Sequence, residues 1–108
     1  MNEGRHLFDK LAEQLIAQPN VARGVMFGMP IVKVNGNAFI GFNKGNATFK
    51  LNGQGHADAL HVNGAVLSDP SGRGRPMKEW VEIPPEESSQ WEKFAQLALT
   101  YVSTLPPK

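Results

Sequence analysis

Cysteine is absent from this chain of 108 residues, and so is any long hydrophobic run. Without cysteine, neither a disulfide framework nor a thiolate metal site can form. No apolar run approaches the roughly 20 residues that would span a bilayer. Residues 1–6 begin a charged, amphipathic stretch rather than a signal peptide. We therefore predict a cytoplasmic protein that does not enter a membrane.

Motifs that mark enzymes are also missing. The sequence has no Gly-x-Ser-x-Gly nucleophile elbow, and no serine has an evident histidine partner. Gly72-Arg73-Gly74 precedes a proline and a predicted strand rather than a helix, so it is not a dinucleotide fingerprint. We therefore predict a protein without catalytic residues or cofactors.

Three potential metal ligands, His56, Asp58 and His61, lie within six residues of one another. The two histidines are five residues apart, which separates them by about 140° around a helix. They would not share a face, and Asp58 is explained by a favourable position in the first helical turn. Solvated polar side chains are the preferred interpretation, and no metal site is predicted.

The small net charge of +1 conceals an uneven distribution. Residues 20–78 carry seven basic and two acidic side chains, whereas residues 79–108 carry two basic and five acidic ones. Such asymmetry can create a local potential that the total hides. The alternative is a set of solvated lysines with no partner. The length and a 41% hydrophobic content suit a single domain over residues 1–108.

Apolar spacing and turn residues together predict the order of elements. Helices are expected over residues 4–17 and 55–61, and a last helix is opened by Pro84-Pro85 or by a capping box at residues 89–92. Strands are expected over residues 24–34, 38–43, 47–51, 65–68 and 77–83. The order is helix, three strands, short helix, two strands, helix. Connections of this kind suit antiparallel pairing, so we predict an α+β fold of two layers with helices on one sheet face.

Side-chain alternation fixes the expected registers. A two-residue turn at Gly45-Asn46 would place Phe42 opposite Phe49 and Ile40 opposite Leu51. A two-residue turn at Asn35-Gly36 would split the apolar residues between both faces. A three-residue loop with a bulge at Gly36 would pair Val32 with Ala38 and keep one face apolar. We therefore predict a first turn of odd length.

The opposite face of this sheet is expected to be solvent-exposed and mixed in character. Its predicted members are Ile31, Lys33, Phe39, Gly41, Thr48 and Lys50. Lysine stems covering an outward phenylalanine would explain it without a function. The functional interpretation is a docking surface for another protein or a second copy of the chain, with Ile31 and Phe39 as the candidate contact residues. Strand parity places Trp80 outward, whereas the general burial of large aromatics favours the core, and both remain open.

A glycine-rich basic loop, residues 71–76, is the second candidate site. Arg73, Arg75 and Lys78 form a basic cluster, and Lys33 and Lys50 are expected on the same exposed sheet face. Backbone N–H groups and guanidinium groups in such a loop can hold phosphate or carboxylate, and basic residues among aromatics hold nucleic acids. A net charge of +1 is low for a polyanion-binding domain. Surface pairing with nearby carboxylates would account for the two arginines without a ligand.

Several motifs resemble the N-terminal domain of the TfoX (Sxy) family. They are Met26-Phe27-Gly28, the hairpin with Gly36 and Phe39, Phe49-Lys50-Leu51, Gly74-Arg-Pro-Met-Lys-Glu-Trp80 and Val81-Glu-Ile-Pro84. The resemblance covers about residues 8 to 102. It implies a small α+β fold similar to secretion chaperones and to the YjbR group. The namesake regulators of natural competence carry a second, helical domain that has no counterpart in this sequence.

The residues and the resemblance together give two expectations for function. The first is a non-enzymatic binding or regulatory module that acts at its sheet face, either through contact with another protein or through self-association as a homodimer. The second is nucleic-acid or other anion binding through the basic loop, as in transcription or competence regulation. No cofactor or metal is expected in either.

Overall fold

The computed structural model describes residues 3–69, 74 and 77–108. Its elements follow in the order α1 (Glu3–Leu15), β1 (Val21–Met26), β2 (Met29–Val34), β3 (Asn37–Asn43), β4 (Asn46–Lys50), α2 (Gly53–Leu60), β5 (Val66–Ser68), β6 (Met77–Ile83), the 3₁₀ helix η1 (Pro85–Gln90) and α3 (Trp91–Ser103). No helix in the described part of the chain is long and apolar enough to cross a membrane.

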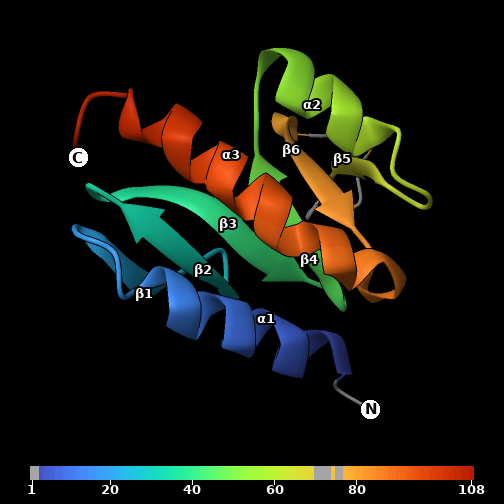
Figure 1. The fold of residues 1–108 in the computed structure, drawn as a ribbon, viewed down its shortest axis with the longest axis horizontal. Helices are drawn as coiled ribbons and strands as arrows, with labels where there is room; N and C mark the ends of the chain where they lie inside the picture. The colour runs from blue at the N-terminus through green and yellow to red at the C-terminus, as the bar shows by residue number, and fades with distance from the viewer. Residues whose placement is uncertain (1–2, 70–73, 75–76) are drawn as a thin grey trace.

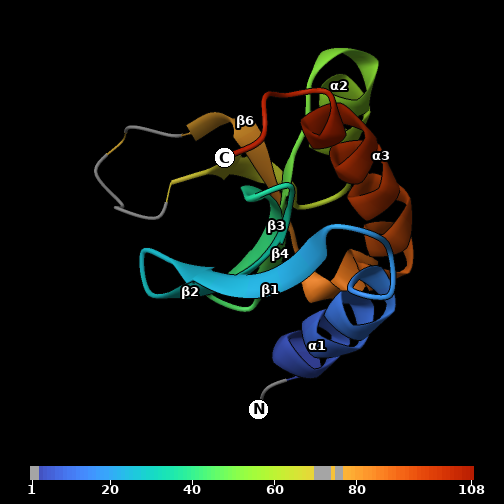
Figure 2. The ribbon, with the colours of Figure 1, turned by 90° about the vertical axis from the view of Figure 1, so that its left-hand side faces the viewer.

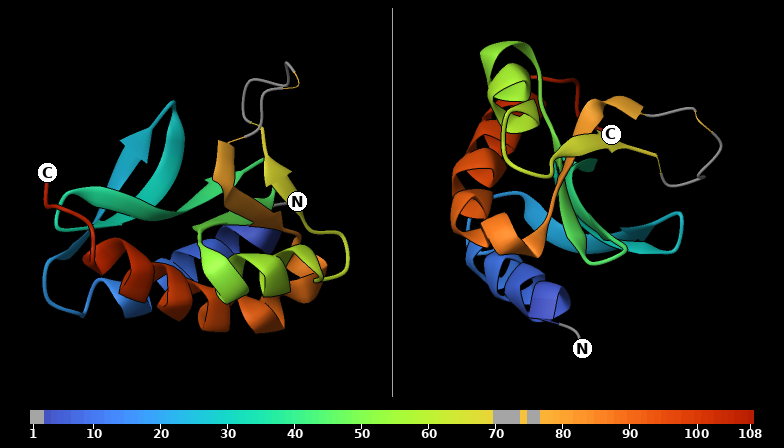
Figure 3. Two further views of the ribbon diagram at one scale, coloured as in Figure 1. Left: turned by 90° about the horizontal axis from the view of Figure 1, so that it is seen from above. Right: turned by 90° about the vertical axis from the view of Figure 1, so that its right-hand side faces the viewer.

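The strands form one antiparallel sheet in the order β1-β2-β3-β4-β6-β5. All helices lie on one side of this sheet (Figures 1 and 3), with α3 packed along β3 and β4. The described residues place no helix on the other side, which we call the helix-free face. The predicted α+β fold of two layers is confirmed.

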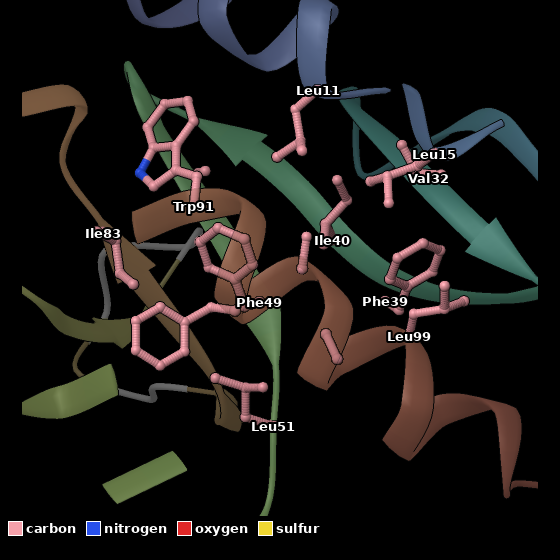
Figure 4. Close-up of a cluster of buried hydrophobic side chains, with 14 of the residues drawn as sticks. Leu11, Leu15, Val32, Phe39, Ile40, Phe49, Leu51, Ile83, Trp91 and Leu99 are labelled. Atoms are coloured by element: carbon pink, nitrogen blue, oxygen red, sulfur yellow. The ribbon is translucent and has the colours of Figure 1, made fainter. Parts of the chain in front are cut away.

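The core lies between the sheet and helices α1 and α3 (Figure 4). Its largest fully buried side chains are Phe8, Phe39, Phe49, Trp91 and Phe94. Phe39 and Phe49 come from β3 and β4, and Phe8 comes from α1. Trp91 and Phe94 come from one stripe of α3, because residues three and four apart share a helix face. Apolar burial of this kind stabilises by about 25 cal/mol per Å² of apolar surface.

The predicted strand over residues 24–34 is wrong, because the structure divides it into two. A two-residue turn at Phe27-Gly28 separates β1 from β2, and Met26 pairs with Met29 across it. The run looks continuous in sequence because the turn is flanked by apolar residues instead of polar ones. The sheet therefore has four strands before α2, one more than predicted.

The predicted odd-length turn between β2 and β3 is also wrong. Asn35-Gly36 is a two-residue turn that closes the pair Val34 and Asn37. The extra residue that the alternation requires is present two positions later, as a β-bulge at Phe39. Val32 consequently pairs with Ile40 instead of Ala38. A bulge places two successive residues on the same side of the strand, so Phe39 joins Ile40 in the core.

The β3–β4 hairpin has the predicted faces in a different register. Its turn is Lys44-Gly45, and it pairs Ile40 with Phe49 and Phe42 with Ala47. In the predicted register, the partners of Ile40 and Phe42 on β4 lay two residues further along the strand. Since side chains alternate with a period of two, this displacement leaves each residue on its predicted face.

Candidate interaction surface

The tip of the β1–β2 hairpin is the most exposed apolar part of the described chain. Val25 is 74% exposed and Phe27 is 75% exposed, more than any other large hydrophobic residue described. Figure 2 shows the hairpin extending beyond the sheet on the side away from the helices. We call residues 25–30 the hairpin tip.

Three two-residue turns in this sheet share one backbone conformation. Phe27-Gly28 has φ angles of 55° and 75°, Asn35-Gly36 has 54° and 84°, and Lys44-Gly45 has 52° and 89°. Both residues of each turn therefore lie in the left-handed region that matches the twist of a hairpin. Asparagine tolerates this region, whereas a bulky aromatic there is a genuine outlier. Phe27 thus occupies a position that the fold fills elsewhere with polar residues.

A single row of paired residues crosses all six strands on the helix-free face. From β1 to β5 the row is Gly24, Ile31, Gly41, Thr48, Glu82 and Val66. A Cβ atom on Gly41 would lie 2.8 Å from Oγ1 of Thr48, so any larger residue there would force the Thr48 side chain to shift. Ile31 and Thr48 are each 5% exposed although no helix covers them. The four central members of the row are therefore buried without a helical layer, whereas Val66 at the β5 end is 54% exposed.

The row contains a buried carboxylate. Glu82 is 7% exposed. It accepts hydrogen bonds from Nδ2 of Asn43 at 2.8 Å, Nδ2 of Asn46 at 3.1 Å and Oγ of Ser68 at 2.9 Å. No cation contacts it within the described residues. Both carboxylate oxygens accept hydrogen bonds from neutral donors, so the group joins β3, β4, β5 and β6.

The predicted anion site is only partly described. Arg73 and Arg75 lie outside the described residues. Lys33, Lys50 and Lys78 belong by strand parity to the helix-free face. Lys33 and Lys50 are separated by one strand, about 10 Å across the sheet. Lys78 is exposed.

One of these lysines already has a partner. Nζ of Lys50 lies 3.9 Å from a carboxylate oxygen of Glu79, and the Tyr101 hydroxyl donates to the same carboxylate at 2.6 Å. This hydrogen bond is the main reason that the pKa of Tyr101 lies above its usual value, and partial burial raises the pKa further. The Glu79 carboxylate therefore joins β6 to α3 and neutralises part of the Lys50 charge.

The predicted contact residues Ile31 and Phe39 are not exposed. Phe39 is wrong as a surface residue, because the bulge turns it into the core, where it is 0% exposed. Ile31 does lie on the helix-free face, but it is buried there. Trp80 is 8% exposed and is paired with Lys50 on the helix-free face. Strand parity and the general burial of large aromatics are therefore both right for Trp80, since it points away from the helices and is still buried.

The base of the β1–β2 hairpin is tied to the helical layer. Nη2 of Arg23 donates to a carboxylate oxygen of Asp9 at 2.7 Å, and Nε of Arg5 lies 3.1 Å from the same oxygen. The hydrogen bond from Arg23 holds the pKa of Asp9 below its usual value. The guanidinium also lies 5.8 Å from the centre of the Phe8 ring. The hairpin is therefore anchored at its base and free at its tip.

Small-molecule and metal sites find little support in the described residues. A pocket of about 220 Å³ lies between α2 and α3, lined by Leu51, Asn52, Gly55, Leu97, Thr100 and Tyr101. Ligand pockets usually occupy about 300–1,000 Å³. The described part of the chain holds no group of three side chains able to ligate a metal.

Sequence reasoning missed the hairpin tip. The glycine of Phe27-Gly28 was the available turn signal, because it interrupts an otherwise apolar run. The apolar flanks hid it. Comparisons with models of protein families, with curated proteins and with solved structures found no match.

Proposed function

We propose that the chain is a non-enzymatic binding module, of the TfoX N-terminal type that it resembles, which acts by self-association through its hairpin tip. The observation that carries this proposal is Phe27, 75% exposed on a backbone with φ of 55°. The α+β order of elements agrees with the resemblance. Backbone strain of this kind is typical of functional positions.

Phe27 imposes two costs on the isolated chain. A left-handed backbone costs a non-glycine residue about 1–2 kcal/mol. An exposed phenylalanine also forgoes the roughly 1.5–3 kcal/mol that burial would provide. Asn35 and Lys44 occupy equivalent turn positions, so the hairpin does not need an aromatic. Contact with another molecule would recover the burial, and buried aromatic anchors dominate the energetics of protein interfaces.

The test is sedimentation equilibrium of the wild-type chain and of Phe27→Asn. The concentrations should run from about 1 µM to about 1 mM, which covers binding free energies of about −8 to −4 kcal/mol. We expect a concentration-dependent assembly in the wild type and a monomer in the variant, because asparagine keeps the turn and removes the aromatic contact. Leu97→Asn is the matched control, since Leu97 is 40% exposed on α3. A wild-type chain that stays monomeric throughout overturns the proposal.

Anion binding is the second candidate, favoured by the position of Lys33, Lys50 and Lys78 on one sheet face. The fluorescence anisotropy of labelled duplex and single-stranded DNA, titrated at two salt concentrations, tests it. Phosphate contacts would make binding fall steeply with salt. Lys33→Ala with Lys78→Ala should then weaken binding, whereas Lys10→Ala with Lys93→Ala, on the helices, should not. Flat titrations at both salt concentrations reject this candidate.

A further inference from the structure

The two edges of the sheet differ in how they are protected. The β5 edge has only three residues, and its ladder shifts between Leu67 and Ser68. Short length and a bulge are common protections against pairing with another chain. The β1 edge has six residues in unbroken register with β2, and it contains neither proline nor lysine. β1 is therefore the less protected edge, since its one charged residue, Arg23, is paired with Asp9 of α1.

The register shows which backbone groups of β1 are free. Met26 and Met29 close a two-residue turn, so they form a hydrogen-bonded pair. At the other end of the hairpin, the Asn35 N–H donates to the Asn20 carbonyl. Asn20 is an even number of residues from Met26, so it fits the same alternation of hydrogen-bonded pairs. Even-numbered residues of β1 therefore bond to β2, and odd-numbered ones point outward. Val21 N–H contacts the Gln18 carbonyl, which leaves the N–H and C=O groups of Arg23 and Val25 at the edge.

We propose that β1 pairs with β1 of a second copy in antiparallel orientation, centred on Gly24, so that two sheets become one. This inference rests on the proposed self-association and specifies its geometry. Arg23 of each copy would exchange two hydrogen bonds with Val25 of the other, giving four in total. In this register each odd-numbered residue of one copy lies opposite an odd-numbered residue of the other. Opposite residues point to the same side of a sheet, so the helices of both copies lie on the same side of the joined sheet.

Side-chain chemistry disfavours two neighbouring registers. A centre on Arg23 would place two arginines directly opposite each other, which is unfavourable. A twofold axis that passes between two residues would shift the register by one residue. The apolar core face of one copy would then lie on the opposite side of the joined sheet from that of the other. Centring on Gly24 brings the exposed Phe27 of one copy against Val21 of the other. The hairpin tip then adds apolar burial to a short ladder that backbone hydrogen bonds alone would not hold.

Directed disulfide formation tests this register, because the chain has no cysteine of its own. The two Gly24 residues would form a non-hydrogen-bonded pair with Cα atoms about 4.5 Å apart, within the range that a disulfide bridges. A Cβ on Gly24 would make ordinary contacts, the closest at 3.4 Å to Cε of Lys33. Gly24→Cys should therefore fold, and circular dichroism of the reduced variant checks this.

We expect Gly24→Cys to form a disulfide-linked dimer under mild oxidation. Val66→Cys, on the opposite edge and 54% exposed, should remain monomeric. Adding Phe27→Asn to Gly24→Cys should abolish the link. Suppose that the wild type assembles through Phe27 while the two cysteine variants link equally or not at all. That combination of results overturns β1 pairing and leaves the proposed function intact. A monomeric wild type overturns both.

A backbone variant provides a second test that needs no cross-link. Val25→Pro removes an outward N–H that β2 does not use, at a position where an edge strand accepts proline. Two hydrogen bonds per dimer are lost, so the dissociation constant should rise about fivefold or more. Unfolding by urea should show that the variant remains folded. An unchanged dissociation constant in the folded variant contradicts the pairing.

Discussion

Two adjacent rows of the sheet, one residue apart along each strand, are buried in different ways. The row beneath the helices contains Val32, Ile40, Phe49 and Val81, all 0% exposed and packed against α1 and α3. The row on the helix-free face contains Ile31, Gly41, Thr48 and Glu82, which no helix covers. The first row is buried by large side chains from a second layer. The second row is buried without such a layer, and the carboxylate of Glu82 in it is satisfied by hydrogen bonds.

This contrast shows what each face tolerates. On the helix side, stability depends on volume, so a missing side chain leaves a cavity. On the helix-free face it depends on satisfied hydrogen bonds, so a missing partner leaves a buried polar group without one. The hairpin tip depends on neither. Substitutions should therefore separate the three regions by the size and sign of their effects.

The largest effect is expected at Phe39. Phe39→Ala should lower the free energy of unfolding by about 3–5 kcal/mol, because it opens a cavity in the core. Phe27→Ala is the matched control, since the same side chain is removed from an exposed position, and it should cost less than about 0.5 kcal/mol. Urea unfolding monitored by circular dichroism measures both. Equal costs would show that Phe39 does not lie in the core.

A smaller loss is expected at Glu82. Glu82→Ala should cost about 2–3 kcal/mol, because the donors of Asn43, Asn46 and Ser68 lose their acceptor. Glu82→Gln, which keeps one acceptor oxygen, should cost less. Glu92→Ala, on an exposed position of α3, should be close to neutral. If Glu82→Ala unfolds at the same urea concentration as Glu92→Ala, the hydrogen-bond network contributes nothing to stability.

A gain in stability is expected at the hairpin tip. Phe27→Asn should raise the free energy of unfolding by about 0.5–1 kcal/mol, because asparagine accepts the left-handed backbone with less strain. The reverse exchange in the second turn, Asn35→Phe, should lower it by a similar amount. Urea midpoints measured below the concentration of any assembly compare the two. Destabilisation by Phe27→Asn would mean that the aromatic supports the fold.

The smallest effect concerns Asp9, whose side chain is 39% exposed. Its pKa is lower in the folded chain than the ordinary value of 3.8. The stability that this contributes is present above pH 3.8 and is lost as the pH falls through the lowered folded pKa. Solvent screening limits the contribution to a few tenths of a kcal/mol. Urea midpoints of the wild type and of Asp9→Asn should converge below this range, and a constant difference down to pH 2 would contradict the assignment.

Most of the fold could be predicted from periodicity, because apolar spacing survives in α1, α3, β4 and β6. The exceptions arose where tertiary packing changed the local pattern. The bulge at Phe39 solved the parity problem that the sequence had raised, but nothing in the sequence located it. The candidate surface was harder to predict, since Phe27 occupies a turn position that usually holds a polar residue. Phe27 is exposed because the β1–β2 turn carries it beyond the sheet, and the sequence does not show the path of that turn.

The position of β6 between β4 and β5 has a consequence for the order of folding. β1 to β4 are joined by two-residue turns, and such hairpins form in about 1–10 µs. Lys50 must instead find Trp80, 30 positions later, which requires closure of a long loop. Asn43 and Asn46 donate to Glu82 from the β4 side of this junction, so these two hydrogen bonds can form only after the junction closes. Glu82→Ala should therefore accelerate unfolding and leave the folding rate close to that of the wild type.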